Sequence, residues 1–104
     1  MKLQVGIIGN SIKHSLSPII QNLALKTHNI NANYEIWDTP LSKLKNRIEL
    51  LKQPNVLGAN VTIPYKERVI PWLDSLSDEV KAIGAVNTIV NRNGQLHGEN
   101  TDSK

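Results

Sequence analysis

The sequence predicts an α/β protein: a three-layer αβα sandwich whose mixed sheet is mostly parallel, with an antiparallel hairpin at the C-terminal end. Short apolar runs rich in β-branched residues alternate with segments whose apolar residues recur at helical spacing, which is typical of parallel strands covered on both faces. Asn93-Gly94, between two strand-like runs, is the strongest short signal for a hairpin. The 104 residues suffice for one domain with a hydrophobic core.

The chain begins with alternating strands and helices. We expect a buried strand over residues 5–9 and a second strand over residues 34–37. Between them, Ser17-Pro18 combines an N-cap residue with a proline in the first helical turn, and the apolar residues that follow predict a helix to about residue 28. This order of elements favours a parallel sheet with helical connections.

The same signals recur in the middle of the chain. Thr39-Pro40 repeats the cap followed by proline, and it precedes one apolar stripe at helical spacing, formed by Leu41, Leu44, Ile48 and Leu51. A third strand begins at residue 56. It must end before Pro64, because proline has no N–H and disfavours helix at the preceding residue.

The second half of the chain predicts shorter elements. Residues 67–73 favour a short helix, limited by its internal proline. Ser77 is the expected cap of a further helix that Gly84 ends. A strand over residues 85–90 and its return over residues 95–98 form the predicted hairpin.

Composition excludes several classes of function. The net charge of +3 raises the question of nucleic acid, but the basic residues are dispersed, so no nucleic-acid partner is expected and a small anionic substrate is favoured instead. No apolar run is long enough to cross a bilayer. The three histidines lack metal-ligand spacing, and there is no cysteine, which suits a cytoplasmic protein without a metal site.

Polar side chains at strand ends and before a helix are the candidates for a ligand site. Lys66 follows the third strand, which carries Asn60 and Thr62, and the carboxyl edge of such a sheet is where ligands bind. A lysine there is a candidate proton carrier, although a solvated lysine would look the same. Ser15 and Ser17 precede a helix N-terminus and could hold a carboxylate, but a simple cap explains Ser17 equally well.

Two further signals are weaker by themselves. Asp102 follows the last strand, where it could be a ligand-binding carboxylate or only a helix cap. Gly6-x-x-Gly9 is half of a phosphate-binding loop, and no complete dinucleotide or nucleotide motif is present, so a simple turn explains the two glycines.

Together, four short motifs occur in order over nearly the whole chain and resemble the N-terminal, substrate-binding domain of shikimate dehydrogenase. They are Ser15-Leu16-Ser17-Pro18, Asn60-Val61-Thr62-Ile63-Pro64-Tyr65-Lys66, Gly84-Ala85-Val86-Asn87-Thr88 and Gly98-Glu99-Asn100-Thr101-Asp102. The resemblance implies a substrate-binding domain over residues 1–104. It also implies participation in the reversible, NADP-dependent reduction of 3-dehydroshikimate to shikimate, in aromatic amino-acid biosynthesis.

The resemblance also implies a role for each matching residue. Ser15 and Ser17 would hydrogen-bond the substrate carboxylate. The ring hydroxyls would be surrounded by Thr62, Lys66, Asn87 and Asp102. Lys66 would be the general acid/base, with Asp102 orienting it, because hydride transfer at a secondary alcohol requires a proton to move on or off its oxygen. In some family members an acidic residue at the place of Asp78 contacts the cofactor.

The chain departs from the family at two places. Gln21-Asn22 stands where many relatives have His-Asn, and Ser103-Lys104 differs from the usual continuation. The NADP-binding Rossmann domain is expected to lie outside this chain, since it has no glycine-rich dinucleotide loop. We therefore expect this chain to be a domain of a longer enzyme and to be inactive alone. A homodimer of the full-length protein is one option for its assembly. A stand-alone shikimate-binding module and a relative that also accepts quinate are the alternatives.

Overall fold

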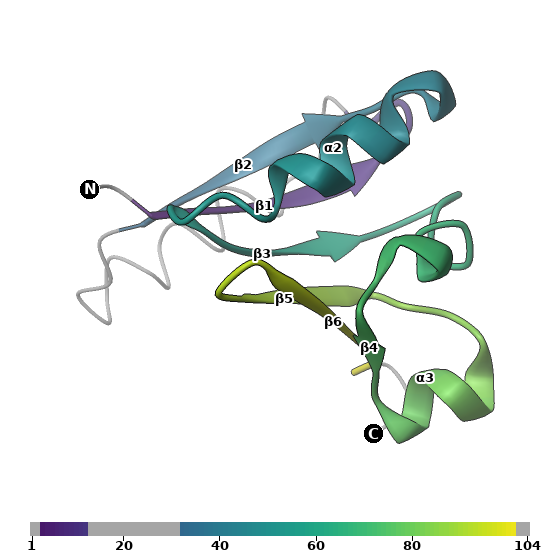
Figure 1. Ribbon diagram of the computed structural model, residues 1–104. Helices are drawn as coiled ribbons and strands as arrows, with labels where there is room; N and C mark the ends of the chain where they lie inside the picture. Colours follow the sequence, from purple (N-terminus) through teal and green to yellow (C-terminus); the bar gives the residue numbers. More distant parts are fainter. Residues whose placement is uncertain (1–2, 13–31, 102–104) are drawn as a thin grey trace.

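The computed structural model describes residues 3–12 and 32–101, which form a six-stranded mixed sheet in the order β2-β1-β3-β5-β6-β4 (Figure 1). The predicted α/β class and its C-terminal hairpin are confirmed. The first predicted helix, with Ser15 and Ser17, and the carboxylate of Asp102 lie outside the described residues.

The parallel half of the sheet has β1 (Leu3–Gly9) at its centre. This strand pairs in parallel with β2 (Ala32–Asp38) on one side and with β3 (Val56–Val61) on the other. All three strands were predicted from their apolar runs. β1 and β2 are one or two residues longer at their ends than expected, and β3 begins at residue 56 as predicted but ends at Val61, before Thr62. Because the strands are parallel, the ends of β1 and β3 reach the same carboxyl edge of the sheet.

The antiparallel half is built on β5 (Thr88–Arg92), which pairs with β3 and with β6 (Gln95–Glu99). Asn93 and Gly94 join β5 to β6 with φ angles of 54° and 87°, the left-handed conformation that a type I′ turn requires. A two-residue strand, β4 (Ser75–Leu76), adds in parallel to β6. Sequence reasoning missed β4, because two residues are too short for a periodic pattern.

The described helices are short. They are η1 (Leu41–Lys43), α2 (Leu44–Leu50), η2 (Ile70–Trp72) and α3 (Asp78–Ile83). The predicted boundaries of α3 are confirmed, because the Ser77 hydroxyl accepts from Val80 N at 3.2 Å and Gly84 ends the helix at φ 80°.

Three predictions of local structure were wrong. Thr39 does not cap a helix, since its hydroxyl donates to Trp37 O at 2.7 Å. The helix predicted over residues 67–73 shrinks to the single 3₁₀ turn η2, consistent with the proline inside it. Residues 85–87 precede β5 instead of belonging to it. The backbone groups of Val86 and Asn87 form hydrogen bonds with Lys66, Val61 and Glu99.

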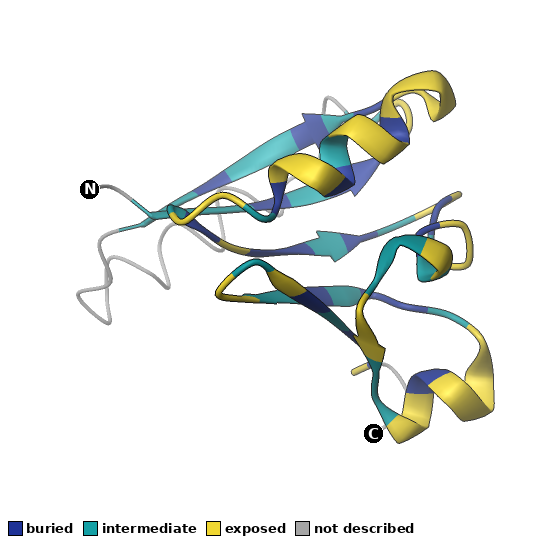
Figure 2. Ribbon diagram, viewed as in Figure 1, coloured by how far each residue is buried: buried dark blue, intermediate teal, exposed yellow. Residues whose placement is uncertain are grey.

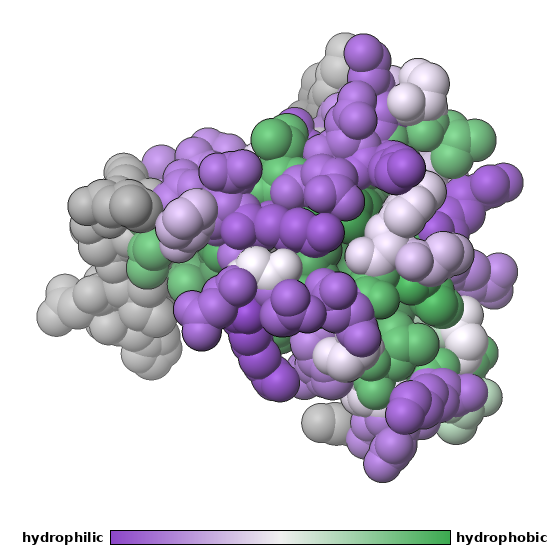
Figure 3. Space-filling model, viewed as in Figure 1, coloured by the Kyte–Doolittle hydropathy of each residue, from purple (hydrophilic) through white to green (hydrophobic). Residues whose placement is uncertain are grey.

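The main core lies between α2 and one face of the sheet (Figure 2). Leu44 and Ile48 of α2 are fully buried, in the same cluster as strand residues Ile8, Trp37, Ala59, Val61 and Ile89. The outer side of α2 is mostly hydrophilic (Figure 3), as expected of an amphipathic helix. Arg47 lies over the Trp37 ring, 5.2 Å from its centroid, which covers the core at the edge of the helix.

Close contact between β3 and β5 depends on Gly58. A Cβ atom there would lie 2.1 Å from the backbone oxygen of Ile89, which cannot rotate away. We therefore expect Gly58→Ala to lower the free energy of unfolding by about 3 kcal/mol, measured by urea denaturation. Gly84→Ala is the matched control, since open space surrounds that position and only its left-handed backbone costs about 1 kcal/mol. Equal losses in the two variants would contradict this account of the strand contact.

Candidate functional site

The segment that follows β3 is fixed by backbone and side-chain hydrogen bonds. Thr62 N donates to Ile8 O at 2.9 Å, and Tyr65 N donates to Thr62 O at 3.0 Å, so the chain turns sharply at the carboxyl edge of the sheet. The Tyr65 side chain is buried and its hydroxyl donates to Thr39 O at 2.7 Å. This residue therefore ties the turn to the segment that follows β2.

Lys66 leaves this turn at the rim of an open pocket of about 480 Å³. The described lining consists of Ile63, Pro64, Lys66, Glu67 and Arg68. The lysine is half-buried, and its backbone oxygen accepts from Val86 N at 2.7 Å. The predicted position of Lys66 at the sheet's carboxyl edge is what the structure shows.

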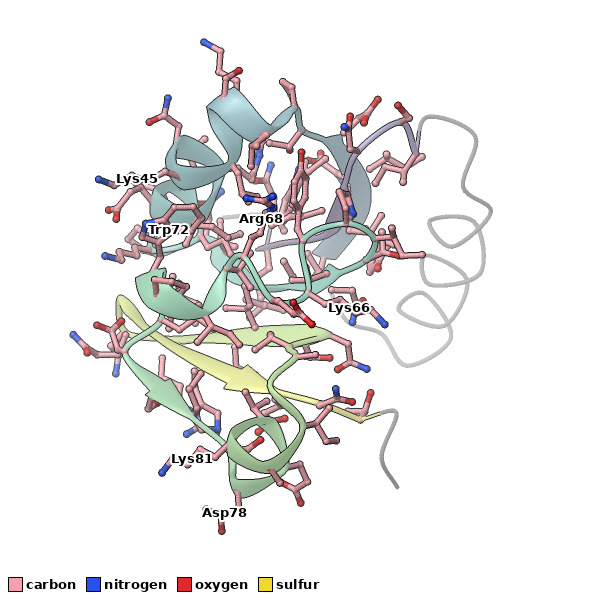
Figure 4. All side chains as sticks on the ribbon, turned by 90° about the vertical axis from the view of Figure 1, so that its right-hand side faces the viewer. Lys45, Lys66, Arg68, Trp72, Asp78 and Lys81 are labelled. Carbon is pink, nitrogen blue, oxygen red and sulfur yellow. The ribbon has the colours of Figure 1, made fainter. Side chains whose placement is uncertain are left out.

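Asp78 lies far from this pocket. Figure 4 shows it on α3 at the bottom of the view, while Lys66 lies near the middle, and Asp78 is exposed. The structure therefore does not bring the predicted cofactor-contacting residue together with the lysine. A contact between Asp78 and a cofactor would have to be made outside the pocket beside Lys66.

Asn87 is buried, with 9% of its surface exposed, and it joins three segments. Its backbone oxygen accepts from Val61 N at 2.8 Å, and its backbone N–H donates to Glu99 O at 3.0 Å. Its side-chain oxygen accepts from the Thr88 hydroxyl and from Thr101 N, both at 3.0 Å, while its amide nitrogen donates to Thr101 Oγ1 at 3.0 Å. The side chain is therefore held in one orientation at the end of the sheet.

Gly9 makes room for Thr62. A Cβ atom at Gly9 would lie 2.6 Å from Thr62 Cγ2 and 3.2 Å from Ile63 O. Sequence reasoning explained this glycine as a simple turn after the first strand, in preference to half of a phosphate-binding loop. Its role in the structure is to let the end of β1 approach the Asn60–Lys66 segment closely.

Asp38 is a residue that sequence reasoning missed. Its carboxylate oxygen Oδ1 accepts from Ser11 N at 2.7 Å and from Ile12 N at 3.3 Å, so it fixes the start of the loop that follows β1. That loop leads toward Ser15 and Ser17, which lie outside the described residues. An aspartate directly at the end of a parallel strand was a usable signal, because its side chain falls at the carboxyl edge.

Of the predicted site residues that the structure describes, it links Thr62, Lys66 and Asn87 through hydrogen bonds of neighbouring backbone segments. Within residues 3–12 and 32–101 there is no group of three or more His, Asp or Glu side chains that could hold a metal ion. The same part of the chain contains no helix long and apolar enough to cross a membrane. What it offers a ligand is an open pocket at the sheet edge, with Lys66 in its lining.

Both tyrosines are expected to resist ionisation. Burial raises the pKa of Tyr65 above its ordinary value of 10; Arg68 lowers it and Asp38 raises it by smaller amounts. Burial also raises the pKa of Tyr34. Above pH 10 the folded state therefore binds more protons than the unfolded state, so their contribution to stability is complete below pH 10 and is lost as pH rises through the raised values.

Urea denaturation between about pH 8 and about pH 11 measures this effect. We expect the free energy of unfolding to fall above pH 10, and Tyr65→Phe to make that fall shallower. The variant also loses the hydrogen bond to Thr39 O, so it should be less stable at neutral pH by about 1 kcal/mol. Identical pH dependence in the two proteins would contradict the assignment to Tyr65.

Comparisons with known proteins give one consistent result. The family model described as shikimate dehydrogenase substrate binding domain matches residues 7–89. An NADP(+) shikimate dehydrogenase of Streptococcus thermophilus is 49% identical over 96 residues, which are 92% of this chain and 34% of that protein. The chain thus spans about a third of the length of the curated relatives it matches.

Solved structures agree with this. Shikimate 5-dehydrogenase of Thermus thermophilus in complex with shikimate is 40% identical, with a TM-score of 0.91, over 96% of this chain and 38% of that one. The shikimate dehydrogenase of Aquifex aeolicus is 44% identical, with a TM-score of 0.93, over 97% of this chain and 38% of that one.

Proposed function

The chain belongs to the shikimate dehydrogenase substrate binding domain family, and we propose that it forms the substrate half of the active site of an NADP-dependent shikimate dehydrogenase. The whole enzyme would reduce 3-dehydroshikimate reversibly to shikimate. The observation that carries the proposal is the backbone hydrogen bond from Val86 N to Lys66 O, at 2.7 Å. It places the segment before Asn87 directly against the turn that carries the lysine, so two of the four family motifs form one wall.

Substrate recognition follows from the chemistry of the groups in this wall. Thr62 and Asn87 are neutral groups that suit the neutral ring hydroxyls, and a site built on such hydrogen bonds rejects analogues that lack the hydroxyl. We assign Ser15 and Ser17 to the substrate carboxylate, since two hydroxyls before a helix N-terminus favour an anion. Asp102 would accept hydrogen bonds from the ring hydroxyls beside Lys66.

Lys66 would carry the proton in the reaction. Oxidation of a secondary alcohol removes a hydride from carbon and a proton from oxygen, and a lysine beside that oxygen can take the proton and return it in the reverse direction. Asp102 would orient the ammonium group. The nicotinamide of NADP, when bound, accepts or donates the hydride.

The described residues do not fit a dinucleotide. The chain has no glycine-rich dinucleotide loop, and Asp78 does not share the pocket with Lys66. We therefore propose that NADP is held mainly by a separate domain of the longer enzyme. By the same reasoning the 104-residue chain would bind shikimate without turning it over. A cytoplasmic location, which the absence of cysteine favours, belongs to the same proposal.

Replacement of Lys66 by alanine tests the catalytic assignment. In a full-length enzyme that contains this chain, Lys66→Ala should lower kcat for NADPH-dependent reduction of 3-dehydroshikimate by about 10³-fold, because the proton carrier is lost. KM should change much less. Near-normal turnover would overturn the role of Lys66.

Lys81→Ala is the matched control, since Lys81 is an exposed lysine of α3 that Figure 4 shows away from the pocket. It should leave kcat and KM unchanged. A calorimetric titration of shikimate into the 104-residue chain tests the binding role separately. Turnover by that chain alone would contradict a cofactor site on another domain.

A further inference from the structure

A row of polar side chains crosses the sheet on the face opposite α2. The Tyr34 hydroxyl donates to Asn60 Oδ1 at 2.6 Å, reaching from β2 over β1 to β3. Asn60 Nδ2 lies 3.4 Å from Thr88 Oγ1, and the Thr88 hydroxyl lies 3.0 Å from Asn87 Oδ1. Asn60 and Thr88 are direct partners in the pairing of β3 with β5, so their side chains share one face.

The direction of every hydrogen bond in this row is determined from its far end. Thr101 N is a backbone donor, so the side-chain atom of Asn87 that it contacts at 3.0 Å must be the oxygen. The Thr88 hydroxyl, with one hydrogen, must then donate to that oxygen and accept from Asn60. Asn60 therefore turns its nitrogen to Thr88 and its oxygen to Tyr34.

This direction leaves Asn87 with one kind of group for a ligand. Both acceptor positions of its oxygen are taken, by the Thr88 hydroxyl and by Thr101 N. One amide hydrogen is donated to Thr101 Oγ1 at 3.0 Å, and the second hydrogen is a donor. Asn87 thus presents an N–H, which requires an acceptor oxygen on the ligand.

We propose that Tyr34, Asn60 and Thr88 are positioning residues that hold Asn87 as a donor toward an oxygen of the substrate ring. The inference rests on the proposed function for the identity of the ligand, but the hydrogen-bonded row is a property of the chain without ligand. Tyr34 lies on β2, two strands away from β3, and the row connects it to Asn87 through described hydrogen bonds. Without the Tyr34 hydroxyl, the side-chain amide of Asn60 can flip, so that its oxygen, instead of its nitrogen, faces Thr88.

Two measurements on the 104-residue chain test this. The first is the NMR signal of the Asn87 side-chain amide in the ligand-free protein. Tyr34→Phe should move that signal although it removes only one remote oxygen, and Thr88→Val should move it as well. Thr88→Ser keeps the hydroxyl and should restore the wild-type signal. Thr39→Val is the matched control, because it removes a buried threonine hydroxyl bonded to Trp37 O, outside the row.

The second measurement is the Kd for shikimate, by NMR titration. We expect it to rise about fivefold in Thr88→Val and about threefold in Tyr34→Phe, the effect of roughly one hydrogen bond, and to change less than about twofold in Thr39→Val. In the double variant Tyr34→Phe/Thr88→Val the two effects should not add, because one break already uncouples Asn87.

Each outcome has a distinct meaning. An unchanged Asn87 signal in Tyr34→Phe, or additive effects on Kd in the double variant, would overturn the row as a positioning device. If Tyr34→Phe moves the Asn87 signal but shikimate does not bind to the wild-type chain, the coupling stands and the proposed ligand is overturned. Movement of the Asn87 signal in Thr39→Val as large as in Tyr34→Phe would show a general structural effect and would also overturn the inference.

Discussion

The site depends on two backbone hydrogen bonds that clamp the segment before β5 against the end of β3. Val61 N donates to Asn87 O at 2.8 Å, and Val86 N donates to Lys66 O at 2.7 Å. These bonds join a segment that is not itself a strand to both the last residue of β3 and the turn beyond it. Without them Thr62, Lys66 and Asn87 would lie on independent loops, with no reason to face a common ligand. Buried backbone groups must be paired, so the bonds that satisfy these groups also hold the segment of Asn87 against the turn that carries Lys66.

Small residues make this close approach sterically feasible. Gly58 lets β5 approach β3, and Gly9 leaves space for the methyl group of Thr62. Gly6 does the same for the Trp37 ring, since a Cβ atom there would lie 2.5 Å from the indole. These glycines therefore serve packing between neighbouring strands, and the site inherits its geometry from that packing.

Sequence patterns predicted most of the elements because their signals are local. Apolar runs gave β1, β2 and β3, and Asn93-Gly94 gave the hairpin turn. What failed was information that exists only between distant residues. Residues 85–87 look like the start of a strand, but their backbone N–H groups pair with Lys66 O and Glu99 O, which are distant in the sequence. The two residues of β4 carry no pattern, and they form a strand only because β6 offers a free edge.

The candidate site shows the same division. Lys66 and Thr62 were predicted as site residues from their place at the end of the third strand, and Asn87 was predicted only from a family motif. A role of Tyr34 in the site could not be predicted in this way, because its place in a strand of apolar residues indicates an aromatic packing residue. Only the sheet register brings its hydroxyl across β1 to Asn60.

A wall fixed in this way has a consequence for catalysis. Polar groups held by backbone pairing and by a directed row of side chains do not need to reorganise when a ligand arrives, so their hydrogen bonds act at full strength in the transition state. The pocket beside Lys66 is open, however, and water weakens each of these interactions. These hydrogen bonds would therefore gain their full effect only where water is excluded from the pocket. Under the proposed function, this domain would hold the substrate in a fixed orientation, and a separate NADP-binding domain would close over it.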